Sequence, residues 1–205
     1  SNPSAPANDM FLINNIKKIL FPFYKEKGIK QILGILNGDK KNNAMLVGGC
    51  VRNFLNNEKI GDIDIATIFT PGELIKKFSK TDFRLIKSGI DHGTITLFKD
   101  GKNFELTTLR EDIVTDGRHA KVSFTKDWKA DSERRDFTIN AIYLDQNGTI
   151  FDPQNGVQNL KEKKIKFMGD PQKRIEEDYL RILRFLRFSI HYKSFTKDDQ
   201  TFKII

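Results

Sequence analysis

The chain has 205 residues, 38% of them hydrophobic, and a formal net charge of +8. This length allows one large domain, or one domain together with a second, small domain. The excess of basic residues favours binding to a polyanion such as nucleic acid, although proteins from a lysine-rich proteome carry a similar charge without binding any polyanion. The single cysteine, Cys50, excludes an intrachain disulfide, and three histidines without a cysteine cluster argue against a zinc site. No apolar run reaches transmembrane length and no signal-peptide pattern is visible, so no membrane partner and a cytoplasmic location are expected.

Hydrophobic periodicity and turn residues divide the first 150 residues into short helices and strands. Residues 1–8, SNPSAPAN, have the composition of a disordered lead. Helices are predicted at 10–20, 29–36, 51–55 and 71–79, with a break at Gly28 between the first two. Strands are predicted at 44–47, 62–68, 83–86, 94–98 and 104–109, the last two joined by an Asp100-Gly101 turn.

The second part of the chain contains the longest predicted helix. Residues 111–127 are polar and contain a glycine, so they are predicted to form a mobile loop, and Asn147-Gly148 predicts a β-hairpin. Residues 171–190 are predicted to form one helix, with Asp170 as its N-cap and Pro171 in its first position. Between residues 161 and 193 there are ten Lys or Arg against five Asp or Glu, so five of the eight net positive charges lie there. Strands followed by helix indicate an α+β head at 9–150, then a connector and the start of a helical neck at 151–205.

Two aspartates separated by one isoleucine are the most informative feature of the sequence. In an extended strand Asp62 and Asp64 point to the same face, about 7 Å apart along the backbone, and Ile63 and Ile65 point to the other. Two carboxylates this close repel each other, and a hard divalent cation such as Mg²⁺ removes that cost. The pair therefore predicts a metal site, although many such pairs are only solvated strand ends.

A glycine pair precedes these aspartates by about fifteen residues. Gly48 and Gly49 allow the backbone to approach an anion closely, and Arg52 follows on the predicted helix, where it can reach the same anion. A Gly-Gly turn alone is usually only a turn. Together with the carboxylate pair, it indicates a metal-dependent site that handles phosphate.

Four segments, GGCVRN, GDIDIAT, ERRDFTINA and EDYLRILRFLRF, occur in this order and spacing between residues 44 and 192. In the order and spacing of these four segments, the chain resembles the class II tRNA nucleotidyltransferases (CCA-adding enzymes) and their bacterial poly(A) polymerase relatives. The resemblance implies a nucleotidyltransferase head with a mixed β-sheet and flanking helices, followed by a helical neck. Proteins of this family continue into a tRNA-binding body and tail, so the chain is expected to be the head and neck portion.

The resemblance also implies roles for individual residues of the head. Asp62 and Asp64 are implied to bind two catalytic Mg²⁺ ions, and Glu105 is implied to be a third strand carboxylate near them. The glycine pair and Arg52 are implied to contact the triphosphate. The family usually has aspartate after this arginine, whereas Asn53 stands here and lacks the charge that could orient Arg52.

In the RRD motif, the resemblance implies that Arg135 contacts the nucleotide and that Asp136 lies near the ribose. Along the predicted neck helix, Ile182, Leu183, Leu186 and Ile190 form one apolar stripe at 100° per residue. The opposite side carries Phe185 and Phe188 among four charged positions that the resemblance assigns to nucleotide contact: Asp178, Arg181, Arg184 and Arg187.

The chemistry of the charged positions explains how they can select a base. An ionised aspartate only accepts hydrogen bonds and arginine only donates, so Asp178 with Arg181 would match the edges of cytosine and adenine and oppose those of uracil and guanine.

The predicted function is template-independent addition of CMP and AMP, from CTP and ATP, to the 3′ end of tRNA, with release of pyrophosphate. Full CCA, CC-only, A-only and poly(A) products stay open, as does the oligomeric state. A non-catalytic basic RNA-binding module is the alternative from another class, and a histidine-dependent phosphohydrolase has no support because the histidines are isolated.

Overall fold

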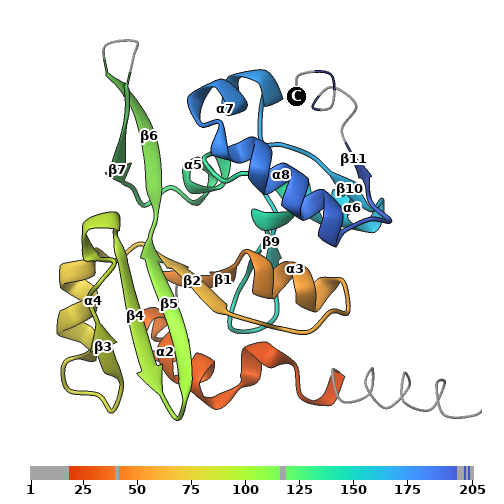
Figure 1. The fold of residues 1–205 in the computed structure, drawn as a ribbon. Coiled ribbons are helices and arrows are strands. Elements are labelled where there is room, and N and C mark those ends of the chain that lie inside the picture. Colours follow the sequence, from red (N-terminus) through yellow and green to blue (C-terminus); the bar gives the residue numbers. More distant parts are fainter. Residues whose placement is uncertain (1–18, 40–41, 116–118, 198–200, 202, 204–205) are drawn as a thin grey trace, which may run out of the picture.

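The computed structural model describes residues 19–39, 42–115, 119–197, 201 and 203. At its centre is a seven-stranded mixed sheet with the strand order β3-β4-β5-β2-β1-β8-β9 (Figure 1). The parallel pair is β2 with β5, and the other neighbours in this sheet are antiparallel. The strands are β1 (Ala44–Val47), β2 (Ile63–Thr67), β3 (Arg84–Ile86), β4 (Thr94–Lys99), β5 (Lys102–Thr108), β8 (Tyr143–Leu144) and β9 (Ile150–Phe151). The predicted α+β class with a mixed sheet and flanking helices is confirmed.

Helices and two smaller sheets surround this central sheet. The α-helices are α2 (Lys27–Asn37), α3 (Gly49–Leu55), α4 (Pro71–Phe78), α5 (Trp128–Glu133), α6 (Gly156–Lys161), α7 (Pro171–Glu177) and α8 (Leu180–His191). The 3₁₀ helices are η1 (Phe23–Lys25), η2 (Ile90–His92) and η3 (Thr138–Asn140). The smaller sheets pair β6 (Arg110–Thr115) with β7 (His119–Phe124), and β10 (Lys164–Ile165) with β11 (Thr196–Lys197). No helix among the described residues is long and apolar enough to cross a membrane.

Period-2 alternation gives the central sheet one apolar face and one face that carries charged groups. Ile65 of β2 and Phe104 and Leu106 of β5 are buried in the core cluster that includes the apolar residues of α2 and α4. Gly28 lies against this face, because a Cβ there would stand 2.6 Å from the Phe104 ring. Gly28 is therefore part of α2 and does not mark the predicted break, and residues 10–18 of the predicted preceding helix lie outside the described residues.

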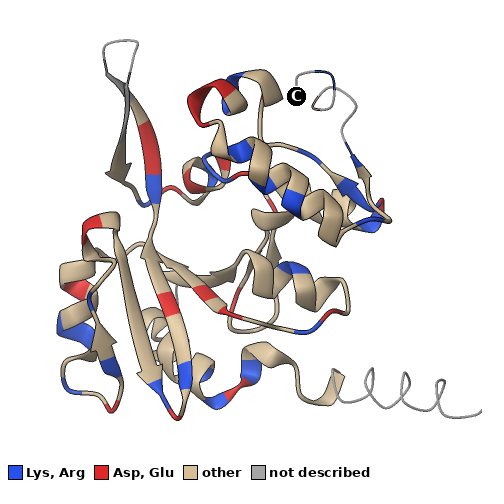
Figure 2. Cartoon of the chain, viewed as in Figure 1, with Lys and Arg blue, Asp and Glu red and all other residues tan. Residues whose placement is uncertain are grey.

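The other face of the sheet carries the acidic residues. Parallel pairing places Asp64 of β2 in register with Glu105 of β5, and Glu105 also pairs with Thr96 of β4. A second, smaller apolar cluster on this face contains Met45, Val47, Ala66, Leu109 and Tyr143. Figure 2 shows the acidic positions on β2 and β5 on one side and basic positions on α8 on the other.

The segment predicted as a mobile loop, 111–127, is a β-hairpin where it is described. β6 and β7 pair antiparallel from Arg110 with Phe124 to Thr115 with His119, and they project from the sheet as a separate arm (Figure 1). The loop prediction was wrong because this polar, glycine-containing segment shows little of the hydrophobic alternation by which a strand is predicted. Residues 116–118 of the predicted loop lie outside the described residues.

The single neck helix predicted at 171–190 is two helices. The chain is extended at Asp178 (φ −155°, ψ 102°), between α7 and α8, and the Asp178 carboxylate accepts a hydrogen bond from the Leu180 amide at 3.0 Å. Helical periodicity continues across this break, so spacing alone could not locate it. Asp178 and Arg181 consequently do not lie on one continuous helix.

The buried face of α8 is not the predicted apolar stripe. Leu183, Leu186 and Ile190 are exposed, and Phe185 is fully buried. The Phe185 ring packs against Phe167 at a centroid distance of 5.4 Å and belongs to the main core cluster. The two phenylalanines set among arginines, Phe185 and Phe188, therefore attach α8 to the head, because aromatic rings bury more area than the aliphatic stripe offers.

This assignment predicts opposite sensitivities for two neighbouring residues of α8. Phe185→Ala should lower the free energy of unfolding by about 3–5 kcal/mol because it leaves a cavity in the core. Leu183→Ala should change it by less than about 0.5 kcal/mol because that side chain is already in water. Urea denaturation followed by circular dichroism measures both, and equal losses would contradict the assignment.

Candidate active site

Three carboxylates lie on the polar face of the sheet. Asp64 lies in β2 and is partly buried, Asp62 lies one residue before β2 and is exposed, and Glu105 is exposed on β5. Burial, together with the negative charges of Glu105 and Asp62 and against the opposing effect of Arg135, raises the pKa of Asp64 to about 6. The predicted acidic group is thus brought together, with Asp64 as its most buried member.

The turn between β1 and α3 places its backbone next to Asp64. Gly48 has φ 76° and ψ −141°, a conformation that L side chains rarely adopt, and a Cβ there would stand 3.6 Å from Asp64 Oδ2. At Gly49 a Cβ would stand 3.4 Å from Arg52 Nη2. Both predicted glycines therefore leave open the space between the carboxylate and the arginine.

Arg52 is fixed on several sides. Its Nε donates to Asn53 Oδ1 at 3.2 Å, and its Nη1 donates to Asn140 Oδ1. Its guanidinium carbon lies 4.9 Å from the centroid of the Phe188 ring and 5.5 Å from that of Tyr192. These cation–π contacts come from α8 and the residue that follows it, so the neck holds an arginine of the head.

Arg135 is embedded in a polar group beneath the site. Its Nη2 donates to Asp131 Oδ2 at 3.0 Å and its Nε lies 3.3 Å from Tyr143 Oη, while Tyr143 donates to the same aspartate oxygen at 2.7 Å. Burial raises the pKa of Tyr143 well above its ordinary value, so the hydroxyl stays protonated. Asp136 accepts from the Phe137 amide at 2.8 Å and from Asn140.

A polar cavity of about 510 Å³ joins these groups to α7 and α8. Seven of its lining side chains are arginines and three are aspartates, an excess of four positive charges. Its lining residues are Gly48, Gly49, Arg52, Asp64, Arg110, Arg134, Arg135, Asp136, Asn140, Arg174, Asp178, Arg181 and Arg184. A cavity of this size and charge suits a small polyanion.

Several predicted residues do not line this cavity, and several lining residues were not predicted. Arg187 is exposed and Glu105 lies on the sheet outside the lining set. Arg110, Arg134, Arg174 and Asn140 line it without having been predicted. Arg134 stands in the same RRD motif as Arg135 and could have been found there, whereas Arg110 and Arg174 reach the cavity only through the folding of the arm and of α7.

Arg174 connects the neck to the RRD motif. It is buried, and its Nη2 donates to the backbone oxygens of Arg134 and Arg135 at 2.9 and 2.6 Å. Burial lowers the pKa of Arg174, and the nearby charge of Arg181 adds to that effect. Arg181 in turn donates to Glu177 at 2.7 Å and to the backbone oxygen of Arg174.

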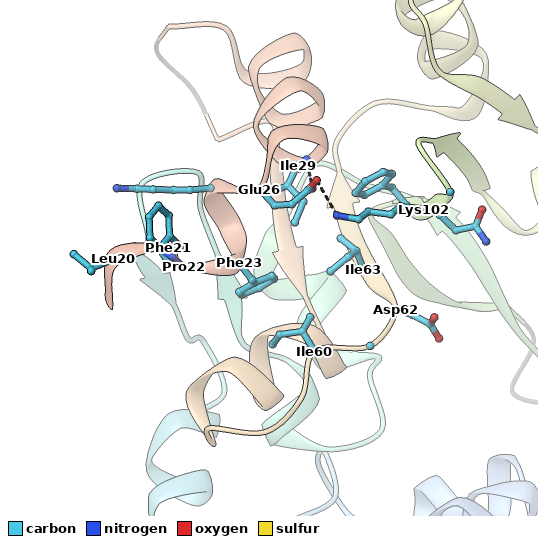
Figure 3. Close-up of a pocket in the computed structure, with 15 residues that line it drawn as sticks. Leu20, Phe21, Pro22, Phe23, Glu26, Ile29, Ile60, Asp62, Ile63 and Lys102 are labelled. Carbon is cyan, nitrogen blue, oxygen red and sulfur yellow. Dashed lines mark hydrogen bonds and ion pairs between the residues drawn. The ribbon is translucent and has the colours of Figure 1, made fainter. Parts of the chain in front are cut away.

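A second cavity, of about 770 Å³, lies on the other face of the sheet beside η1 and α2. Figure 3 shows the side chains of Phe23, Ile29 and Ile63 lining it, with Glu26 bridging to Lys102. Asp62 lies at its edge, and its carboxylate points away from these apolar side chains (Figure 3). The cavity therefore belongs to the apolar face and not to the site around Asp64.

Comparison with known proteins gives the family. The model of the family described as poly(A) polymerase head domain matches residues 44–166, which is more than half of the chain. The chain belongs to this family. The predicted resemblance to tRNA nucleotidyltransferases and bacterial poly(A) polymerases is thereby confirmed.

The relatives of this head domain are longer than the chain. The CCA tRNA nucleotidyltransferase 1, mitochondrial, of Homo sapiens is 51% identical over 151 residues, which are 73% of this chain and 35% of that protein. The CCA-adding enzyme of Staphylococcus haemolyticus is 45% identical over 162 residues, 78% of this chain and 39% of the relative. A crystal structure of the Bacillus stearothermophilus CCA-adding enzyme in complex with CTP superposes with a TM-score of 0.72 at 35% identity, over 88% of this chain and 43% of the other.

The acidic residues of this poly(A) polymerase head domain fit a divalent cation. Within the described part of the chain, no three His, Cys, Asp or Glu side chains converge closely enough to hold an ion by themselves. Asp62 and Asp64 supply hard oxygen donors, and Mg²⁺ commonly takes one or two carboxylates together with substrate phosphates and water. The charge repulsion that raises the pKa of Asp64 is the cost that such an ion would remove.

A stability measurement tests the strain at Asp64. A folded pKa of about 6, against an ordinary value of 3.8, means that stability falls as pH rises from about 4 to 6 and that the full cost is present above pH 6. In EDTA at pH 7.5, Asp64→Asn should therefore raise the free energy of unfolding, by up to about 3 kcal/mol. Thermal unfolding at pH 7.5 and at pH 4 measures this. The gain should vanish at pH 4, and a variant less stable than wild type at pH 7.5 would contradict it.

Proposed function

We propose that this protein is a template-independent nucleotidyltransferase that adds CMP and AMP, from CTP and ATP, to the 3′ end of tRNA and releases pyrophosphate. The observation that carries the proposal is the cationic cavity that opens beside the Asp64 carboxylate. The names of the relatives support it, since those proteins are CCA-adding enzymes and one of the similar structures holds a primer tRNA and an ATP analogue. The chain spans about a third of the length of these relatives.

The reaction forms one phosphodiester bond and breaks one phosphoanhydride bond. The 3′ oxygen of the acceptor attacks the α-phosphorus, and the bond from this phosphorus to the bridging oxygen of the β-phosphate breaks. Arg52, beside the glycine turn, would neutralise charge on the β- and γ-phosphates as pyrophosphate leaves. Arg135, held by Asp131 and Tyr143, would present donors to the nucleotide from a fixed position.

Asp62 and Asp64 would hold two Mg²⁺ ions, with Glu105 beside them on β5. The ions, when bound, would lower the pKa of the attacking hydroxyl and stabilise charge at the phosphorus. The strand register keeps Asp64 and Glu105 side by side, so the spacing of these two carboxylates depends on the sheet and not on a loop. No protein nucleophile is needed.

Asp178 and Arg181 would select the base. Both line the cavity near α7 and α8, where an acceptor and a donor face the space left for a base. In this conformation Arg181 is bonded to Glu177, so base pairing would require it to exchange that partner for the base. A wrong base would leave buried polar groups unpaired, which discriminates strongly.

The product and the location stay open within this proposal. Full CCA, CC-only, A-only and poly(A) addition use heads of the same kind. The cytoplasmic location also stays a prediction, since the name of one relative places that protein in mitochondria. We further propose the division into a head at 9–150 and a neck beginning at 151–205, with the part 171–190 selecting the nucleotide. Incubating the protein with tRNA that lacks its CCA end, with each nucleoside triphosphate separately, identifies the product.

The acidic pair provides the first test of the reaction. Asp62→Ala and Asp64→Ala should each reduce nucleotide transfer by at least about a thousandfold, because the metal site is lost. Binding to the same RNA, measured by filter retention, should stay within about twofold of wild type. This outcome also separates the enzyme from the non-catalytic RNA-binding module, which would lose nothing. Asp82→Ala, in an exposed ion pair with Lys99, is the matched control.

Base selection gives a second test that does not require tRNA. Asp178→Ala should weaken CTP and ATP binding and reduce the preference for CTP over UTP by about tenfold or more, because the acceptor for the exocyclic amino group is removed. Equilibrium binding of the four nucleoside triphosphates measures it. Glu176→Ala, an exposed acidic residue of α7, should keep the wild-type preference. An unchanged preference in Asp178→Ala would remove this residue from base selection.

A further inference from the structure

Arg52 is held by a group of residues that the proposed function does not use. The Tyr192 hydroxyl donates to Glu58 Oε2 at 3.0 Å and lies 3.4 Å from Asn53 Oδ1, the same oxygen that accepts from Arg52 Nε. The ring of Tyr192 also lies beneath the Arg52 guanidinium. We propose that Tyr192 and Glu58 are positioning residues for Arg52, through which docking of the neck sets the affinity of the head for the triphosphate. The inference rests on the proposed function, since it concerns the arginine assigned there to the triphosphate.

Asn53 fits its position for a reason that the sequence does not show. Its side-chain oxygen accepts from Arg52, and its side-chain nitrogen donates to the backbone oxygen of Lys59 at 3.0 Å. An aspartate could not make the second bond, because an ionised carboxylate has no donor. The negative charge that these contacts connect to Arg52 is that of Glu58, which accepts from the Tyr192 hydroxyl, while the Tyr192 ring lies over the guanidinium.

Glu58 is itself held in place. Its Oε1 accepts from Asn56 Nδ2, and its backbone amide donates to the Asn53 backbone oxygen at 2.8 Å. Both bonds come from the end of α3 and the turn after it, so the carboxylate is presented to Tyr192 from the head. Tyr192 is 4% exposed, and burial raises its pKa to about 12, so the hydroxyl is available as a donor at neutral pH.

Arg52 has one nitrogen of its guanidinium, Nη2, directed towards the glycine turn of the candidate site. Its Nε and Nη1 have partners within the protein, and its Nη2 lies beside Gly49, where a Cβ would stand only 3.4 Å away. Fixing two nitrogens of a planar guanidinium fixes the third, because the group has no internal rotation. The aromatic pair and Asn53 thus direct Nη2 towards the glycine turn.

The neck therefore contacts both ends of the space proposed for the nucleotide. Arg181 and Arg184 of α8 line the cavity near the base position, while Phe188 and Tyr192 lie on the arginine of the phosphate position. The Phe188 ring is also stacked on Phe137 of the head, at 5.1 Å and 12°. A displacement of α8 would consequently change base contact and phosphate contact together.

The test compares binding of inorganic triphosphate, CTP and CMP to the protein. Tyr192→Phe keeps the ring over Arg52 and removes only the hydroxyl, and Glu58→Gln keeps the shape and removes only the charge. Each should weaken binding of inorganic triphosphate and of CTP by about tenfold and that of CMP by less than about twofold, because a bond to a charged group is lost on the phosphate side. Isothermal titration calorimetry measures all three ligands.

A double variant shows whether the two residues act through one bond. If Glu58 acts through the Tyr192 hydroxyl, Glu58→Gln should have no additional effect in the Tyr192→Phe background. Tyr24→Phe and Glu162→Gln, which line neither cavity, are the matched controls and should bind all three ligands as wild type does. A general structural weakening would move the melting temperature and all three affinities together.

Each outcome decides the inference. Equal weakening of CMP and triphosphate, additive effects in the double variant, or triphosphate binding as tight as wild type in either single variant would overturn it while leaving the proposed function intact. If the wild-type protein binds neither CTP nor inorganic triphosphate, the proposed function fails and the inference fails with it.

Discussion

The parallel pairing of β2 with β5 is the constraint on which the site depends. It places Asp64 next to Glu105 on one face and Ile65 next to Leu106 on the other, so each carboxylate is fixed by the burial of its neighbours. The apolar face provides the free energy that keeps like charges close, and the pKa of Asp64 is raised by its burial and by the negative charges of Glu105 and Asp62. The sheet thus holds carboxylates close together in a way that a bound cation would stabilise.

The side of the polar cavity formed by α8, across from the carboxylates of the sheet, depends on aromatic packing. Phe185 is fully buried, and Phe188 is stacked on Phe137, so α8 is attached by rings while Arg181 and Arg184 remain at the cavity. Guanidinium groups that must stay available to a ligand cannot contribute much to this attachment, because an unpaired charge is costly to bury. The interleaving of phenylalanine with arginine therefore separates two tasks along one helix. Of the aliphatic stripe, Ile182 packs against the core cluster, whereas Leu183, Leu186 and Ile190 are exposed.

Local signals in the sequence were sufficient for the sheet and for most of the acidic site. The alternation across residues 62–65 predicts which face of β2 each side chain occupies. The predicted turns form at Asp100-Gly101 and Asn147-Gly148, with positive φ at Asp100, Gly101 and Gly148. The four motifs identified the family. The break at Asp178 and the arm of β6 and β7 were missed, because neither is marked by a change in the hydrophobic period of the sequence. Helical spacing continues through Asp178, and only the hydrogen bond to Leu180 and the packing of Phe185 reveal two helices.

The departure at Asn53 illustrates why a motif can be incomplete and its chemistry intact. Judged by the motif alone, loss of a carboxylate beside Arg52 removes the group that orients it. In the fold, the arginine has four neighbours from three segments: Asn53 and Asn140 accept its hydrogen bonds, and Phe188 and Tyr192 cover its face. Orientation of Arg52 is then a property of the packed environment and not of one neighbour in the sequence.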